Sequence, residues 1–336
     1  MVGSQGTVVV IIPTFNRRDV LLDAVRSVLA QSYSDLRCVV ADNGSTDGTR
    51  AALASFQDDR LSVVAHEKPL GIAGGRNFGL AADDGGEWVA FLDSDDLWAP
   101  TKLARQLAAM AAQPEARWAV CGSVTFAVDM RVSSAARLVD RPLAAPVEVL
   151  IGQQELRALL KEENHVPGGS SNVIVQRDLL RKVGLFCTDL RTCEDWDMWL
   201  RLAKESAIAY VDSPLVACRT WLGQSSANSF DFIPSAAEVR AKNFPDDGPL
   251  PRSYSARWER DIARRQVAAG QRWPAARSYL RAAWLGRAPG QLAYALATAT
   301  SPQIVEHRLR RLEISRTMPA GWKDEVEQWL GPWRNS

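Results

Sequence analysis

The strongest constraint on the fold is the regular alternation of short apolar runs and helical segments in the first hundred residues. The apolar runs at 7–13, 36–42, 61–67 and 87–93 are separated by segments with helical features at 18–32, 45–56 and 74–85. Continuous runs rich in valine and isoleucine are typical of strands covered on both faces. This order predicts an α/β layer fold with a mostly parallel sheet, in which ligands collect at the carboxyl ends of the strands.

The stretch FLDSDDLW places three carboxylates, Asp93, Asp95 and Asp96, directly after the fourth apolar run. Carboxylates this close repel one another unless a cation offsets their charge, and this favours a cation-binding site. A helix cap or a solvated turn would also accommodate them, and the stretch alone leaves all three readings open. Asp42 ends another predicted strand. The two acidic sites are therefore expected at the same edge of the sheet.

Composition limits the partners and the compartment. The chain has 336 residues, 46% of them hydrophobic, and a net charge of +1. That charge gives no general attraction to nucleic acid or to anionic lipid, so we expect no nucleic-acid partner. Five scattered cysteines without a CxxC pair, no signal-peptide pattern and no apolar run of about 20 residues predict a cytoplasmic protein without a transmembrane segment.

The second half of the chain predicts three regions. Strand and helix patterns continue to about residue 225, so we assign residues 1–225 to one catalytic domain. Residues 226–251 are rich in serine, asparagine, aspartate and proline and are predicted as a linker. Residues 252–336 are rich in arginine, alanine and tryptophan and are predicted as a C-terminal helical region. Two roles for this region stay open, a cover over an acceptor cleft and a homodimer contact.

Four motifs in order resemble the inverting glycosyltransferases of family 2. They are VVIIPTFNR at 9–17, VVADNGSTDGT at 39–49, GGRNFGL ahead of FLDSDD, and EDWDMWLRL at 194–202. The resemblance covers roughly residues 7–222. It implies the GT-A fold and the transfer of a sugar, with inversion, from a nucleotide-diphosphate donor, a UDP-sugar in our prediction. The acceptor would be a hydroxyl or an amine of a small molecule or glycan, either a cell-surface glycan precursor or a secondary-metabolite intermediate.

The turn after the first strand is predicted to cradle the nucleotide base. Asn16 is expected to cap the following helix. The resemblance implies that Asp42 accepts a hydrogen bond from an NH group of the base, which suits an acceptor-only carboxylate. An Asx turn within DNGSTDGT is the alternative for Asp42. The residues predicted to contact the nucleotide here are Pro13, Thr14, Phe15, Asn16, Arg17 and Asp42.

The stretch GIAGGRNFG is predicted to bind the diphosphate. Arg76 offers a planar fork of donors, and glycines near a helix start allow close approach of the backbone. The predicted contacts are Gly71, Arg76 and Asn77. A GxGxxG motif does not follow the first strand, and this disfavours an NAD-type oxidoreductase.

By the same resemblance, DSD at 93–95 is the metal motif. Asp95 would be the direct ligand of Mg²⁺ or Mn²⁺, and Asp93 would hold the ribose or a metal-bound water, with Ser94 beside the donor. Hard oxygen ligands suit these ions. Asp96 is expected to cap the next helix.

The acidic pair in CEDWDMWLRL is predicted to be catalytic. The resemblance makes Asp195 the general base, with Glu194 beside it at the start of a helix. A helix N-terminus keeps a carboxylate ionised and fixed in direction. Trp199 is expected to pack in the core, and for Trp196 a core position and a contact with the acceptor both stay open. A non-catalytic nucleotide-sugar-binding relative is the alternative function, and the intact acidic pair argues against it.

The sequence departs from the family at one position. Relatives often carry a histidine after the last core strand that joins the metal site, and here Trp221 stands there. Gln224 or a water would then replace that ligand. His165 could substitute, although a structural role is the simpler interpretation.

Overall fold

The computed structural model describes residues 6–126, 132–138, 148–219, 232–248, 251–268, 270–301, 305, 318–319 and 321–335. The chain forms two compact units. The first unit comprises Met1–Asp189, Glu194–Arg219 and Met318–Ser336, and the second comprises Leu190–Cys193 and Thr220–Thr317. No described helix is long and apolar enough to cross a membrane.

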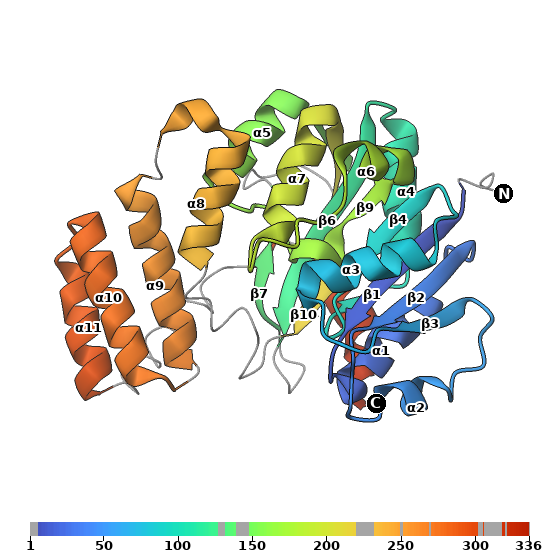
Figure 1. Ribbon diagram of the computed structural model, residues 1–336, viewed down its shortest axis with the longest axis horizontal. Coiled ribbons are helices and arrows are strands. Elements are labelled where there is room, and N and C mark those ends of the chain that lie inside the picture. Colours follow the sequence, from blue (N-terminus) through green and yellow to red (C-terminus); the bar gives the residue numbers. More distant parts are fainter. Residues whose placement is uncertain are drawn as a thin grey trace. The chain divides into compact units, whose positions relative to one another are not determined.

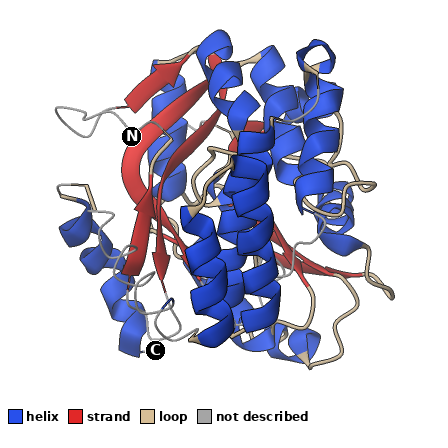
Figure 2. Ribbon diagram, turned by 90° about the vertical axis from the view of Figure 1, so that its left-hand side faces the viewer, coloured by secondary structure: helices blue, strands red, loops and turns tan. Residues whose placement is uncertain are grey.

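A ten-stranded sheet forms the centre of the first unit (Figures 1 and 2). Its main strand order is β3-β2-β1-β4-β9-β6-β10-β5, with β7 beside β6 and β8 beside β10. The first four strands run parallel, as predicted, and β9 runs antiparallel to β4 and β6. The strands are β1 (Val8–Thr14), β2 (Leu36–Asp42), β3 (Leu61–Ala65), β4 (Trp88–Phe91), β5 (Leu97–Trp98), β6 (Ala116–Phe126), β7 (Val132–Ala136), β8 (Glu148–Ile151), β9 (Ile174–Gln176) and β10 (Ala207–Arg219).

Helices flank the sheet because alternate residues of each strand point to opposite faces. Val8, Val10 and Ile12 of β1 share a core with α1 and α4. Ile11 of β1 points the other way, toward α3, where Gly79 leaves room for it. The helices of the first unit that precede residue 220 in the sequence are α1 (Arg18–Leu29), α2 (Thr49–Leu53), α3 (Gly71–Ala82), α4 (Lys102–Ala112), α5 (Gln153–Glu162), α6 (Arg177–Val183) and α7 (Glu194–Glu205).

The end of the chain belongs to the first unit rather than to the helical region assigned from sequence. Helix α13 (Trp322–Leu330) buries Trp322, Trp329 and Leu330 in the core shared by the sheet and α4. The indole nitrogen of Trp329 donates to the carbonyl of Pro214 in β10 at 3.1 Å. The boundaries drawn from composition therefore do not coincide with the compact units.

The second unit contains helices packed on one another. Part of the predicted linker, 226–251, is helical, since α8 (Phe232–Asn243) lies within it. Helices α9 (Arg252–Ala268), α10 (Arg272–Gly286) and α11 (Gly290–Thr300) follow. A small core joins them, formed by Ala263, Val267, Ala275, Tyr279, Ala295 and Val305.

Candidate active site

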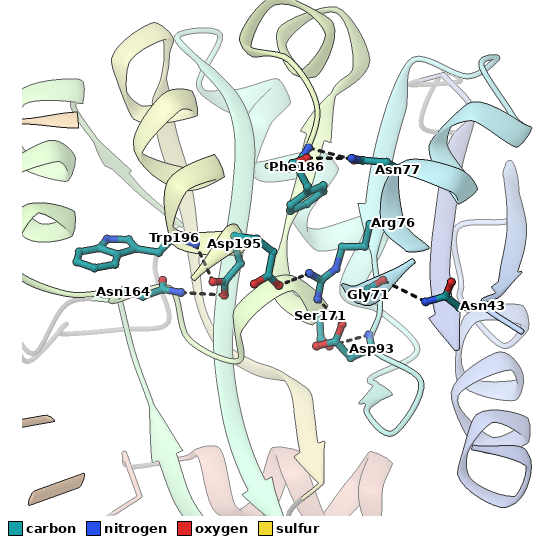
Figure 3. A network of polar contacts seen from close by, with 11 residues as sticks. Asn43, Gly71, Arg76, Asn77, Asp93, Asn164, Ser171, Phe186, Asp195 and Trp196 are labelled. Carbon is teal, nitrogen blue, oxygen red and sulfur yellow. Dashed lines mark hydrogen bonds and ion pairs between the residues drawn. The ribbon is translucent and has the colours of Figure 1, made fainter. Parts of the chain in front are cut away.

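Asn43 connects three segments at the carboxyl edge of the sheet. Its backbone N–H donates to the carbonyl of Thr14 at 2.8 Å. Its side-chain amide donates to the Gly71 carbonyl at 3.1 Å and accepts from the backbone N–H of Leu70 at 2.7 Å (Figure 3 shows the Gly71 contact). The ends of β1 and β2 and the start of α3 are thereby held together. Sequence analysis did not single out Asn43, although an amide at the end of a buried strand is a usable signal.

Asn16 does not cap α1, so that prediction was wrong. The N-cap residue is Arg17, without a side-chain cap, and the backbone N–H of Arg18 instead donates to Asp47 at 3.0 Å. Asn16 adopts a left-handed conformation (φ 51°), which asparagine tolerates better than most residues. Its side-chain oxygen accepts from the backbone N–H of Thr46 at 2.8 Å. The side chain therefore fixes the turn after β2 rather than the helix.

Asp42 accepts a local hydrogen bond from three residues on, rather than from two residues on as in the Asx turn that was the alternative to base contact. Its Oδ1 accepts from the backbone N–H of Ser45 at 2.9 Å, and its side chain is fully buried. Its Oδ2 lies 3.3 Å from Nε of Arg50, close enough for an ion pair but without hydrogen-bond geometry. The hydroxyl of Thr14, which stands opposite Asp42 in the sheet register, also has no hydrogen-bond partner. Two unsatisfied buried polar atoms on neighbouring strand ends are what a polar ligand would satisfy.

Arg76 lies between residues 93–96 after β4, called the acidic loop below, and the start of α7 (Figure 3). Its Nη1 donates to Glu194 at 2.6 Å and its Nη2 to Asp93 at 2.8 Å. The guanidinium also lies over the ring of Phe186, 5.3 Å from the centroid. Burial alone would lower the pKa of Arg76, but the charges of Asp93 and Glu194 outweigh it and raise the pKa above its ordinary value. The structure thus joins residues of two separate motifs through one buried cation.

Asp195 is oriented by two hydrogen bonds at the start of α7 (Figure 3). Its Oδ2 accepts from the side-chain amide of Asn164 at 2.9 Å, and its Oδ1 accepts from the backbone N–H of Trp196 at 2.7 Å. Burial, followed by repulsion from Glu194, raises the pKa of Asp195 to about 7. A carboxylate with a pKa near neutrality is suited to general-base catalysis.

Asp96 has a structural role and does not cap α4, whose N-cap residue is Thr101. The carboxylate is buried and accepts from the hydroxyl of Ser171 at 2.6 Å and from the backbone N–H of Arg219 at 3.0 Å. Burial, with repulsion from the neighbouring aspartates, raises its pKa well above the ordinary value. The Ser171 hydroxyl also accepts from the backbone N–H of Asp93 at 3.0 Å. Asp96 and Ser171 therefore hold the acidic loop in place.

Arginine side chains from distant segments offset the negative charge of the acidic loop. The sequence around the loop gave no indication of these arginines. Arg76 pairs with Asp93, and Nε of Arg219 donates to the carbonyl of Asp95 at 3.2 Å. Burial lowers the pKa of Arg17, and the charge of Asp95 counteracts part of that effect. Within the described ranges, no group of three or more histidine, cysteine or acidic side chains is arranged to hold a metal ion. Among the described side chains, Asp93 and Asp95 therefore have no third acidic, histidine or cysteine ligand grouped with them.

Other predicted donor contacts have local partners. Asn77 exchanges two hydrogen bonds with the backbone of Phe186, at 2.9 and 3.0 Å. Gly71 is the first residue of α3 and has a positive φ of 75°. Ser94 is buried in the acidic loop, whereas the Phe15 side chain is 45% exposed at the end of β1. Of these side chains, Phe15 is the one best placed to meet a ligand from solvent.

Trp196 takes the core position that was one of its two alternatives, and the prediction for Trp199 is confirmed. Trp196 is 1% exposed and its indole N–H donates to the carbonyl of Leu160 at 2.7 Å, so it cannot contact an acceptor. Trp199 is fully buried and stacks on Trp118. His165 lies 3.6 Å from Glu163. Trp221 and Gln224 lie outside the described residues.

Asn164 and Ser171, like Asn43, are functional candidates that sequence analysis missed. Both lie between α5 and β9, Asn164 in a loop and Ser171 in the short 3-10 helix Gly169–Asn172. The adjoining Gly168 and Gly169 have positive φ values of 66° and 56°. A side chain on Gly169 would meet Oδ2 of Asp195 at 3.5 Å. The pair of glycines in VPGGSSN was the available signal for a tight turn against the base.

Solved structures with the same architecture define the class of the fold. Residues 1–349 of TarS from S. aureus, in complex with UDP-GlcNAc, match with a TM-score of 0.56 at 16% identity, over 91% of this chain and 92% of that one. The mannosyltransferase PcManGT from Pyrobaculum calidifontis, in complex with GDP-Man and Mn²⁺, matches with a TM-score of 0.52 at 19% identity, over 93% and 87% of the two chains. The fold is therefore that of GT-A glycosyltransferases.

Sequence comparison identifies the family. The model of "Glycosyl transferase family 2" matches residues 9–184. The putative teichuronic acid biosynthesis glycosyltransferase TuaG of Bacillus subtilis is 32% identical, over 62% of this chain and 77% of its own length. The UDP-Glc:alpha-D-GlcNAc-diphosphoundecaprenol beta-1,3-glucosyltransferase WfgD of Escherichia coli is 28% identical, over 66% and 80%. The chain belongs to glycosyl transferase family 2 and is a glycosyltransferase with a nucleotide-sugar donor.

Proposed function

We propose that this enzyme transfers a hexose or N-acetylhexosamine from a UDP-sugar to a hydroxyl of a cell-surface glycan precursor, with inversion. The relatives' names support this choice, since WfgD uses UDP-Glc and a diphosphoundecaprenol-linked acceptor, and TuaG is assigned to teichuronic acid biosynthesis. The observation that carries the proposal is the buried Arg76, which donates hydrogen bonds to both Asp93 and Glu194. Because Glu194 precedes Asp195, this arginine holds the proposed base near the acidic loop. The five free cysteines fit a reducing compartment such as the cytoplasm.

The uracil base would bind where β1 and β2 end. Oδ2 of Asp42 and the hydroxyl of Thr14 lack hydrogen-bond partners, and an NH group and a carbonyl of uracil would satisfy them. The exposed ring of Phe15 offers a stacking surface. The side chain of Arg50 pairs with Asp42 but is 64% exposed, so a ligand can displace it at low cost.

Asp95 and Asp93 would hold a divalent cation together with the donor diphosphate. Both side chains are half-buried carboxylates on one loop, and Mg²⁺ sites commonly combine one or two carboxylates with substrate phosphates. This donor set of two carboxylates and the diphosphate oxygens fits Mg²⁺ or Mn²⁺. When bound, the cation offsets the negative charge of the departing diphosphate.

Arg76 would act mainly by positioning. Two of its nitrogens already donate to Asp93 and Glu194, whereas Nε is buried without a hydrogen-bond partner. That N–H remains to donate to a ligand. The arginine would therefore hold the acidic loop and the start of α7 at a fixed separation while contacting the donor with its third nitrogen.

Asp195 would remove the proton of the acceptor hydroxyl. As the hydroxyl oxygen attacks the anomeric carbon from the face opposite the diphosphate, the O–H proton passes to the carboxylate and the bond from carbon to diphosphate breaks. Asn164 and the N–H of Trp196 keep the carboxylate oriented. The raised pKa makes the group a stronger base than an ordinary aspartate.

The test is a product analysis with purified protein. The protein is incubated with Mn²⁺, with UDP-Glc or UDP-GlcNAc, and with a synthetic GlcNAc-diphospholipid acceptor. The masses of the products are then measured by mass spectrometry. The expected product gains the mass of one hexose or N-acetylhexosamine, and proton NMR is expected to show a β linkage at its anomeric centre. Tight UDP binding without product from any UDP-sugar and lipid-linked or soluble glycan acceptor would favour the non-catalytic alternative.

A further inference from the structure

Helix α10 carries a stripe of large apolar side chains on the surface of the second unit. Trp273 is 56% exposed, Leu280 50% and Trp284 72%. They recur at intervals of seven and four residues, so they lie on one face of the helix. The other side packs in the core of the unit through Ala275, Ala276, Tyr279, Ala282 and Ala283. Exposed apolar groups that gather on one face indicate an interaction surface.

The same segment is strongly basic, although the whole chain carries a net charge of only +1. Residues 270–301 include four arginines, and they contain no aspartate and no glutamate. Two guanidinium groups lie over the exposed indoles, Arg272 over Trp273 at 4.7 Å and Arg252 of α9 over Trp284 at 5.5 Å. Positive charge and apolar area therefore occupy the same face. The four arginines are Arg272, Arg277, Arg281 and Arg287.

We propose that this face of α10 docks on an anionic lipid membrane surface. Tryptophan favours the boundary between headgroups and acyl chains, leucine adds buried apolar area, and arginine attracts acidic headgroups. Helix α11 also exposes Leu292 and Leu296, by 51% and 68%. The helix lies on the membrane and does not span it.

A second copy of the chain is the rival occupant of this face. In a two-fold dimer the same surface meets itself, so the arginines of α10 would face one another. Glu259 of α9 pairs with Arg281 at 3.5 Å but is only 7% exposed, and α10 and α11 themselves carry no acidic side chain, so that arrangement brings like charges together with little compensation. Anionic lipid supplies the missing counter-charge, and this decides in favour of the membrane.

Membrane docking is independent of the transfer chemistry. It would hold the enzyme where lipid-linked acceptors are presented, but it needs neither donor nor acceptor. The Asp195→Asn variant is accordingly expected to bind membranes like the wild type. Failure of docking and failure of the proposed transfer are thus measured separately.

The experiment is vesicle co-sedimentation of the full chain, without nucleotide sugar. Vesicles of phosphatidylcholine alone are compared with vesicles that also contain phosphatidylglycerol, at low and high salt. We expect binding to the anionic vesicles only, weakened by salt. Leu280→Ala and Trp284→Ala are each expected to weaken partitioning by about tenfold, from the lost apolar burial. Arg277→Glu is expected to weaken it by at least about tenfold, since it reverses one charge.

Controls decide whether the effect belongs to this face. Leu185 of the first unit is 58% exposed, so Leu185→Ala removes a similar exposed side chain and is expected to leave vesicle binding unchanged. Melting curves establish that each variant is folded. Equal binding to neutral and anionic vesicles, or none to either, would overturn the proposal. So would light scattering that shows a dimer which Trp284→Ala converts to monomer.

Discussion

At the scale of single residues, the site depends on two carboxylates, Glu194 and Asp195, that are adjacent in sequence but have different partners in the structure. Glu194 is buried and paired with Arg76, whereas Asp195 accepts hydrogen bonds from an amide and a backbone N–H. The first carboxylate is needed to balance a buried cation, and the second is left to accept a proton. The two amide substitutions should therefore fail in different ways.

Asp195→Asn is expected to lower kcat by roughly a hundred- to ten-thousandfold while UDP affinity stays nearly constant. The substitution keeps the shape of the side chain but removes its ability to accept a proton. One of the two hydrogen bonds to the carboxylate is lost, so only a small change in stability is expected. The measurements are turnover, UDP binding and melting temperature. Turnover within a few-fold of wild type would exclude Asp195 as the base.

Glu194→Gln serves as the matched comparison. It leaves Arg76 with one fewer counter-charge in a buried position, and breaking a buried ion pair commonly costs about 3–5 kcal/mol. The variant should therefore melt at a markedly lower temperature than Asp195→Asn. Similar melting of the two variants, with normal turnover in both, would mean that the acidic pair only complements the helix dipole.

The pKa of Asp195 predicts the pH dependence of transfer. Because the group must be ionised to act, kcat/KM should rise with pH through about pH 7. Asn164→Ala removes a hydrogen bond that favours the charged form, so the acidic limb should move to higher pH by up to about one unit. A pH–rate profile of the two proteins tests this. An unmoved limb with reduced activity would give Asn164 a purely structural role.

Stability should show the same titration with a defined sign. The folded pKa is above the unfolded value of about 4, so between pH 4 and pH 7 the folded protein retains a proton that the unfolded chain has lost. The contribution of Asp195 to stability therefore falls as pH rises across that window. Asp195→Asn should gain melting temperature relative to wild type on going from pH 5 to pH 8.

At the scale of elements, α13 completes the first unit from the far end of the chain. The ring of Trp322 packs directly against Gly122 of β6, which has no side chain. A Cβ at this position would overlap the ring. Arg105 of α4 donates to Glu325 at 2.7 Å. The helix thus fills one face of the sheet next to β6 and β10, and its loss would expose that core.

Trp322→Ala is expected to lower the free energy of unfolding by about 3–5 kcal/mol, because a large buried ring is replaced by a cavity. Trp284→Ala is the matched control, since that ring is 72% exposed and its removal should change stability little. Urea unfolding of both variants measures the difference. Equal midpoints would show that α13 is not part of the cooperative core.

At the scale of the whole molecule, donor binding should stabilise the first unit because the proposed contacts come from several separate elements. Thr14 and Asp42 end β1 and β2, and Asp93 and Asp95 lie on the loop after β4. A ligand at about a hundred times its Kd stabilises the folded state by about 2.7 kcal/mol. Binding of UDP together with the metal should therefore raise the melting temperature of the protein measurably.

UDP with Mn²⁺ is expected to raise the melting temperature by several degrees, and chelator should remove most of this gain. Asp95→Ala should lose the metal-dependent part and most of the activity, since it removes the proposed direct ligand. Thermal shift and turnover, with and without chelator, are the measurements. Full activity in excess chelator would contradict the metal assignment and leave Arg76 as the main neutralising group.

Local sequence was sufficient to predict the parallel first strands, the helices between them and the family. The reason is that strand and helix periodicity depends on residues only a few positions apart. It also placed the acidic groups at the carboxyl edge of the sheet, because parallel strands end on the same side.

Only the tertiary structure decided which groups meet. Arg76 and Glu194 are 118 positions apart, and Asn164 reaches Asp195 from a stretch without periodicity. The cations that offset the acidic loop, the burial of Trp196 and the return of α13 to the sheet likewise depend on how distant segments pack. Partners of this kind are chosen by topology and burial, and no short window of sequence contains that information.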